Sequence, residues 1–159
     1  MDRLLLLVKE NVRLLLGAFV VILTIVIVIT LLLNSRKSTK VLVNGQTISV
    51  MVAKTDKEKQ VGLSGKDKIG ENQGMLFIFD KPNYYSFWMK EMKFSIDIIY
   101  INGDKITTIV ENAKPPSSAS DNLAIYQPSE KSDKVLELNA GSADKLKIKT
   151  GTIVKIENL

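Results

Sequence analysis

The sequence predicts a mainly β (α+β) fold: a small antiparallel β-sandwich or partly open barrel with one or two short helices, preceded by one transmembrane helix. Two observations lead to this fold class. The first is an uncharged, apolar run of 20 residues near the N-terminus. The second is a series of about seven short stretches rich in β-branched and aromatic residues, which Gly, Asn, Asp and Pro separate from one another.

The apolar run covers residues 14–33 and predicts a membrane-spanning helix. At about 1.5 Å per residue it would be about 30 Å long, the thickness of the hydrocarbon core of a bilayer. A cleaved signal peptide would have a shorter apolar region followed by a small-x-small site, which is absent after residue 33. A buried core helix would need more surrounding chain than remains. We therefore expect an uncleaved anchor, with the lipid bilayer as the partner of residues 14–33.

The anchor implies three segments: an N-terminal segment of residues 1–34, a linker of residues 35–40 and a globular domain of residues 41–159. Equal numbers of basic residues precede and follow the apolar run, so the positive-inside rule does not choose an orientation. They are Arg3, Lys9 and Arg13 on one side and Arg36, Lys37 and Lys40 on the other. A short basic tail before an uncleaved span is typical of a signal anchor. We expect a single-pass protein of the cell membrane with an extracytoplasmic domain.

Composition excludes several classes of chemistry. The net charge of +5 is interspersed along the chain, which argues against a nucleic-acid partner. Cysteine and histidine are both absent, so Ser-His-Asp and Cys-His catalysis, His/Cys zinc sites and haem ligation by histidine are excluded. The sequence also lacks the glycine motifs of phosphate loops and a calcium loop. We expect no metal site and no cofactor.

Local patterns predict the elements of the domain. Asn44-Gly45 predicts a tight hairpin between two β-branched stretches, and Thr55-x-x-Glu58 predicts a capping box that opens a short helix ending near Leu63. Residues 114–120 should be irregular because they contain two prolines. Ser142 should cap a single helical turn. Further strands are expected at residues 74–79, 84–89, 94–101, 105–111, 123–128, 135–138 and 152–156.

Five motifs, in order, resemble the domain of unknown function family 192 (DUF192) over about residues 41–156. They are Glu58-x-x-x-Gly62-Leu63, Gly74-Met75-Leu76-Phe77-x-Phe79, Phe87-Trp88-Met89-Lys90-x-Met92, Ile96-Asp97-Ile98 and Val135-Leu136-Glu137-Leu138-x-Ala140-Gly141. The resemblance implies a small β-rich domain, exported or membrane-tethered, with no established biochemical activity. Where this chain has Ser64 the family often has Met, and where it has Lys66 the family more often has Arg. Lys cannot reproduce the bidentate contact of a guanidinium group, so no role of that Arg is assigned to Lys66.

Acidic and basic residues among apolar ones suggest a site. Asp97 and Glu137 each lie inside an apolar strand pattern, and Lys90 follows the aromatic stretch that contains Trp88. Because a buried carboxylate is costly unless it is paired, one hypothesis brings Lys90, Asp97 and Glu137 together in a binding cleft beside Trp88. The alternative is structural: the acids lie on a solvated face, or one of them forms an ion pair with Lys90.

The leading functional hypothesis is a non-enzymatic, membrane-anchored domain that binds a small ligand or a component of the cell envelope through these four residues. Catalytic residues cannot be assigned. One alternative is a carboxylate-dependent hydrolase that acts on cell-envelope carbohydrate, since two carboxylates can serve as acid and base. Another is a structural accessory subunit of a membrane complex. Trp88 and Lys90 could also contact lipid head groups.

Overall fold

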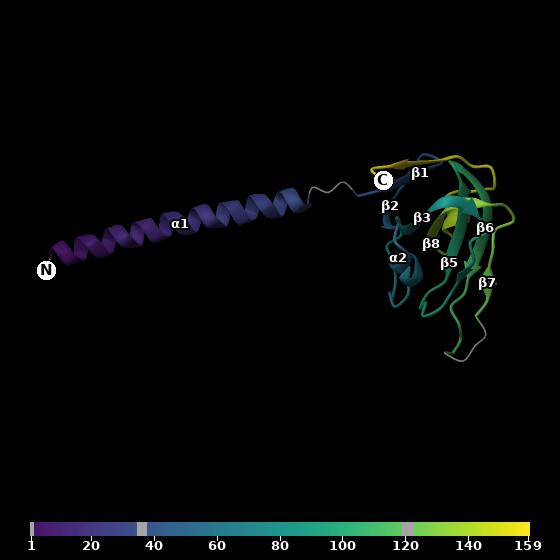
Figure 1. Ribbon diagram of the computed structural model, residues 1–159, viewed down its shortest axis with the longest axis horizontal. Coiled ribbons are helices and arrows are strands. Elements are labelled where there is room, and N and C mark those ends of the chain that lie inside the picture. The colour runs from purple at the N-terminus through teal and green to yellow at the C-terminus, as the bar shows by residue number, and fades with distance from the viewer. Residues whose placement is uncertain (1, 35–37, 119–122) are drawn as a thin grey trace. The chain divides into compact units, whose positions relative to one another are not determined.

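The computed structural model describes the backbone of residues 2–34, 38–118 and 123–159 and, within the N-terminal helix, the side chains of residues 12 and 14–31. Residues 35–37 of the predicted linker and residues 119–120 of the predicted irregular segment lie outside this part. The chain divides into two compact units, Met1–Lys37 and Ser38–Leu159 (Figure 1).

The first unit is a single helix, α1 (Asp2–Asn34). Its segment Leu14–Leu31 is long and apolar enough to cross a membrane, and none of it is buried within the protein. The hydroxyls of Thr24 and Thr30 donate to the carbonyl oxygens of Val21 and Val26 at 2.8 and 2.7 Å. These two polar groups are thus satisfied inside the helix, as the sequence predicts for an apolar helix.

The second unit is built on a curled seven-stranded sheet in the order β6-β5-β8-β3-β2-β1-β9 (Figure 1). A separate two-stranded sheet pairs β4 with β7. The mainly β fold class is confirmed. The strands are β1 (Lys40–Val43), β2 (Gln46–Ala53), β3 (Gln73–Asn83), β4 (Phe87–Trp88), β5 (Ile96–Asn102), β6 (Lys105–Ala113), β7 (Ile125–Tyr126), β8 (Ser132–Asn139) and β9 (Val154–Glu157).

The predicted hairpin and helix at the start of the domain are confirmed. Asn44 and Gly45 both have positive φ, 49° and 76°, as a tight turn between β1 and β2 requires. Helix α2 (Asp56–Val61) begins at Thr55 with both hydrogen bonds of the capping box. Because α2 connects β2 to β3, these two strands pair in parallel, while the other neighbours in the sheet are antiparallel.

The sheet curls until its two edges meet at one end. The Gly151 N–H donates to Ile106 O at 2.8 Å, and the Ile106 N–H donates to Thr152 O at 2.9 Å. The Val154 N–H donates to Asp104 O at 2.8 Å. These bonds join the start of β9 to the start of β6, so the domain is a partly closed barrel.

The sheet has a core on each face. Inside the curl, alternate residues of the strands pack with Ala143 and Ile148; this inner core includes Leu76, Ile99 and Leu136. The outer face of the central strands β3, β5 and β8 is also buried. Side chains from residues 62–69, 87–94 and β7 cover it, so these strands are apolar on both faces.

Helix α3 (Ser142–Lys145) differs from its prediction in one respect. Its N-cap is Gly141, with φ 82°, and no side chain of the cap binds the free N–H groups, so the prediction that Ser142 caps this turn is wrong. The N–H of Ala143 instead donates to a carboxylate oxygen of Asp97 at 2.9 Å. The cap is supplied by another strand, which the local sequence around Ser142 does not encode.

Candidate ligand-binding site

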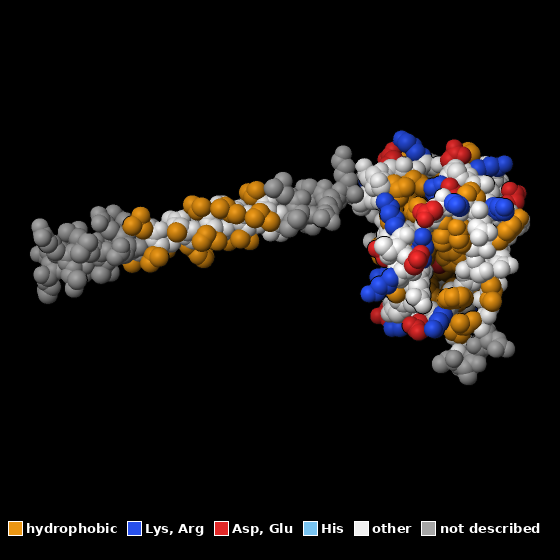
Figure 2. Space-filling view, in the orientation of Figure 1, with side chains coloured by type: hydrophobic (Ala, Val, Ile, Leu, Met, Phe, Trp, Pro, Cys, Tyr) orange, Lys and Arg blue, Asp and Glu red, His pale blue; other side chains and the backbone are white. Residues whose placement is uncertain are grey.

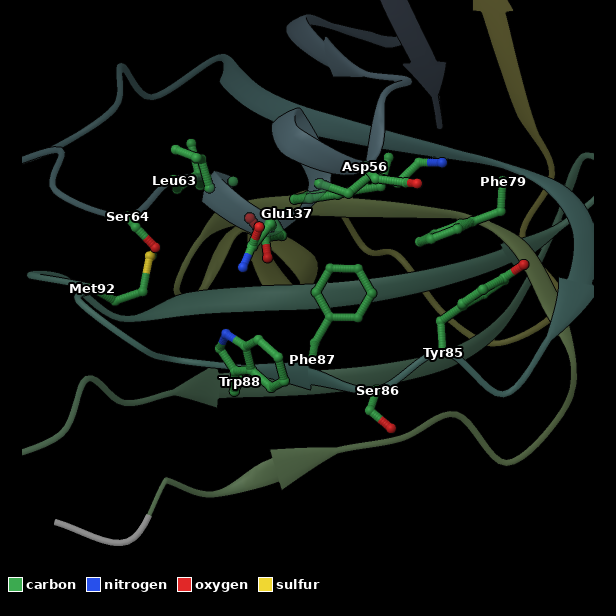
Figure 3. A pocket seen from close by; sticks show the side chains of 15 residues that line it. Asp56, Leu63, Ser64, Phe79, Tyr85, Ser86, Phe87, Trp88, Met92 and Glu137 are labelled. Atoms are coloured by element: carbon green, nitrogen blue, oxygen red, sulfur yellow. The ribbon is translucent and has the colours of Figure 1, made fainter.

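A cavity of about 410 Å³ lies in the outer layer of the domain, between α2 and the segment that contains β4, above β3 and β8 (Figure 3). On the face shown in Figure 2, hydrophobic side chains gather in a hollow whose α2 side carries lysine and acidic side chains. Cavities of about 300–1,000 Å³ are typical of small-molecule sites. Its lining residues are Asp56, Lys59, Gln60, Val61, Gly62, Leu63, Ser64, Phe77, Phe79, Tyr85, Ser86, Phe87, Trp88, Met92 and Glu137.

The end of α2 shapes one wall of this cavity. Gly62 ends the helix with φ 51°, a conformation that residues with a side chain rarely adopt. A Cβ atom there would lie 3.2 Å from Cζ of Phe77. The glycine therefore lets the chain pass closely over the Phe77 ring, and the next residue, Leu63, is buried in the outer core.

Aromatic rings form much of the remaining wall. Phe79 and Tyr85 stack with ring centroids 3.6 Å apart, and Phe77 meets Phe87 edge to face at 5.0 Å. The Tyr85 hydroxyl donates to the carbonyl oxygen of Lys81 at 2.8 Å, which orients that ring. Such pairs contribute about 0.5–1.5 kcal/mol each beyond the area they bury. These contacts within the protein hold the rings of the wall in place.

Glu137 supplies a carboxyl group at the base of the cavity. It lies on β8 between two residues of the inner core, so its side chain is on the outer face, where it is 5% exposed. In Figure 3 it stands among Leu63, Phe87 and Trp88. Its Oε2 is buried and, within the described part of the chain, has no hydrogen-bond partner. Burial without compensation raises the pKa of Glu137 to about 8.

Tyr100 lies on the same outer face and is affected by the same environment. Its hydroxyl donates to the carbonyl oxygen of Tyr126 at 3.0 Å, and its ring meets Phe87 edge to face. Burial, and to a lesser extent the nearby Glu137, raises the pKa of Tyr100 above its ordinary range. Tyr100 therefore keeps its phenolic proton, which it donates to Tyr126 of β7 in the small sheet.

Trp88 and Lys90 border a second hollow of about 270 Å³ beside the first. Trp88 is 49% exposed and lines both hollows, whereas Lys90 lines only the second. The turn that carries Lys90 is held by two bonds from the segment after α2: Ser64 Oγ donates to Lys90 O at 2.8 Å, and the Gly65 N–H donates to Glu91 O at 2.9 Å.

Asp97 lies on the opposite face of the sheet from Glu137. The register of β5 and β8 places Ile98 opposite Glu137, so Asp97 belongs to the inner face, where it is fully buried. Its two carboxylate oxygens accept the N–H groups of Asn112 and Ala143, each at 2.9 Å. Asp97 therefore ties β5 to β6 and α3. Of the four residues that the sequence suggested, Trp88 and Glu137 line the same cavity. Lys90 lines the second hollow, and Asp97 lines neither of these two spaces.

Phe77 and Phe79 of β3 and the α2 residues Asp56 and Lys59 line the cavity but were not among the residues that the sequence suggested. For Phe77 and Phe79 the available signal is the recurrence of Phe in the strand that begins at Gly74, which is equally typical of an ordinary core. The sequence holds no comparable signal for Asp56 and Lys59. In the described residues, no three acidic side chains gather in a way that could hold a metal ion.

Two solved structures and one protein-family model are similar to this domain. A candidate transcription regulator from Sinorhizobium meliloti 1021 is 30% identical in sequence with a TM-score of 0.66, over 76% of this chain and 93% of that chain. A protein of unknown function from Novosphingobium aromaticivorans DSM 12444 is 28% identical with a TM-score of 0.63, over 74% and 83%. A comparison with curated proteins finds no match. Residues 39–156 match the family DUF192, described as "Uncharacterized ACR". The resemblance of the five motifs is confirmed, and the chain belongs to the DUF192 family.

Proposed function

We propose that this protein is a membrane-anchored binding module that takes a small ligand into the aromatic cavity, with Glu137 as the polar contact. One observation carries the proposal: Oε2 of Glu137 is buried in the wall of a preformed cavity without a hydrogen-bond partner among the described residues. An unsatisfied buried polar atom costs about 1–3 kcal/mol, so a core under selection for stability alone would replace it. A ligand that bonds to this atom removes the cost.

The anchor complements this proposal. We propose that α1 spans the cell membrane and that the domain lies on the extracytoplasmic side, so that the cavity samples ligands of the cell envelope. The apolar segment Leu14–Leu31 and its internally satisfied threonines support the first part. The second part rests on the short basic N-terminal tail.

The hydrolase alternative receives less support from the geometry. It needs two carboxyl groups on either side of one substrate bond, about 5–10 Å apart. Asp97 cannot supply one of them beside Glu137, because the sheet lies between the two and Asp97 is occupied by backbone N–H groups. A binding role needs only Glu137 and the aromatic wall.

The chain's single tryptophan makes the proposal directly testable. Because Trp88 borders the cavity, its fluorescence should respond to a ligand that enters. We expect a screen of small envelope-derived compounds against the full chain in detergent to yield compounds that shift Trp88 emission and that also give saturation-transfer NMR signals. Glu137→Leu, which fills the same space without a polar atom, should weaken the hits at least about tenfold.

Tyr84 provides a control because it is an exposed aromatic residue of the same segment that does not line the cavity. Tyr84→Ala should leave ligand affinity unchanged, whereas Phe87→Ala should reduce it. A screen without hits, or hits that bind equally well to Glu137→Leu, would contradict the proposed site.

A further inference from the structure

We infer that the cavity selects ligands that carry a cationic ammonium or amine head group, an assignment of ligand class that rests on the proposed function. The geometry that carries it is a buried carboxyl oxygen of Glu137, without a hydrogen-bond partner among the described residues, in the lining of a cavity that five aromatic side chains share. An ionised carboxyl group and the faces of aromatic rings each favour a cation.

The first step concerns charge. Among the described residues, every ion pair involves other acids, and Glu137 forms none. Lys59 lines the same cavity, but its ammonium group is engaged with an aromatic ring. Lys59 of α2 lies over the ring of Phe79, 4.8 Å from its centroid, and Lys90 borders the neighbouring hollow. Within the described part of the chain, no basic side chain is paired with Glu137, so its carboxyl group can pair with a cation of the ligand.

The second step concerns the walls. Phe77, Phe79, Tyr85, Phe87 and Trp88 line the cavity. The faces of aromatic rings attract cations, and clusters of such rings are the usual way in which proteins hold quaternary ammonium groups. Lys59 over Phe79 shows that a ring of this wall already attracts a cation. Phe77 and Phe87 meet edge to face, so their rings face different directions around the space.

The third step concerns the proton on Glu137. The titratable groups that face it are few: Asp56 and Lys59 from α2, Tyr85 from the aromatic segment and Tyr100 from β5. In the empty cavity the carboxyl group is largely protonated at neutral pH, since burial raises its pKa to about 8. A bound cation stabilises the ionised form, so the proton leaves as the cation enters. The ammonium then occupies a cavity that carries the opposite charge.

A pair of probes of equal shape tests this inference. Choline and 3,3-dimethyl-1-butanol differ only in that a quaternary nitrogen replaces a quaternary carbon. With the full chain in maltoside micelles, we expect choline to shift Trp88 emission with an affinity at least about tenfold higher than its neutral isostere. Glu137→Gln should remove this preference, so that choline binds no more tightly than the isostere. The exposed Glu130→Gln should behave like the wild type.

The proton provides a second readout that a structural role would not move. Choline affinity should rise with pH towards about pH 8, and calorimetry at pH 7 in buffers of different ionisation enthalpy should show proton release on binding. Both effects should be absent in Glu137→Gln. Binding of choline without proton release and without pH dependence would overturn the role of Glu137.

The outcomes separate this inference from the proposed function. If the isostere binds as well as choline, the preference for cations is wrong, while binding in the cavity stands. If neither probe binds but other compounds of the screen do, the preference for cations is again wrong, and binding in the cavity again stands. Reconstitution in phosphatidylglycerol bilayers, with and without phosphatidylcholine, distinguishes the source: competition by the lipid identifies a lipid head group, and undisturbed binding of choline identifies a free amine.

Discussion

Glu137 is the residue whose chemistry differs most from its ordinary behaviour. Its pKa is raised from 4.5 to about 8 by burial, so the folded domain holds a proton that the unfolded chain releases. Between these two pH values the unfolded state binds fewer protons than the folded state. The free energy of unfolding therefore falls as pH rises through this window and levels off above about pH 8. Below pH 4.5 both states are protonated, and the full stability is present.

Glu137→Gln should abolish this part of the pH dependence, because the amide does not titrate. We expect wild type and variant to be similar near pH 4, and the variant to be more stable at pH 9 by on the order of 5 kcal/mol. Urea unfolding of the full chain in detergent, followed by Trp88 emission, measures both. A wild-type stability that is flat from pH 5 to pH 8 would contradict the burial of an unpaired carboxyl. A gain at pH 9 would show that the acid is retained for something other than stability.

Asp97 acts at the scale of elements, because one side chain holds three of them. Its carboxylate joins β5 to the backbone N–H groups of Asn112 on β6 and Ala143 in α3. The bond to Ala143 replaces the missing side-chain cap of α3. The bond to Asn112 supports a residue with φ 51°, a backbone conformation that is uncommon for residues other than glycine.

Asp97→Asn should lower the free energy of unfolding by about 1–3 kcal/mol, because the amide NH₂ faces one of the two backbone N–H groups. The affinity of the cavity for its ligand should not change, since Asp97 lies on the opposite face of the sheet. Asp80→Asn, at an exposed position of β3, is the control and should be neutral. An Asp97→Asn domain of normal stability that has lost ligand binding would reverse this assignment and return Asp97 to the site.

At the scale of the whole molecule, the features that could be predicted are those with local causes. The hairpin at Asn44-Gly45, the capping box of α2 and the long apolar helix each depend on a few neighbouring residues, and all three are present. The parallel pairing of β2 and β3 was not predicted, since it depends on where the chain returns after α2.

The candidate site also depends on contacts between distant residues, which the sequence alone does not define. Alternation within β5 and β8 defines which residues share a face of one strand, but not which faces of two strands coincide. The pairing of Ile98 with Glu137 decides that question and places the two acids on opposite sides. The sequence could therefore suggest both acids as unusual, whereas only their register shows that one is structural and the other lines a cavity.

The anchor is the prediction that concerns the molecule as a whole. If α1 spans the bilayer, the full chain should remain in the membrane fraction after alkaline carbonate extraction. A Leu23→Lys and Val26→Lys double variant should be released, because each charge in the middle of the span costs about 2.5–3.5 kcal/mol. The matched Leu23→Ala and Val26→Ala variant should stay in the membrane. Release of the wild-type chain by carbonate would exclude a spanning helix.

The side of the membrane can be read from the same chain because it contains no cysteine. Lys131→Cys places a single thiol at an exposed position of the domain, and Asp2→Cys places one at the N-terminus. On intact cells, a membrane-impermeant maleimide should label the Lys131→Cys variant and should label Asp2→Cys only after lysis. Labelling in the opposite order would place the cavity in the cytoplasm, where its ligand would have to be sought among cytoplasmic amines instead of envelope components.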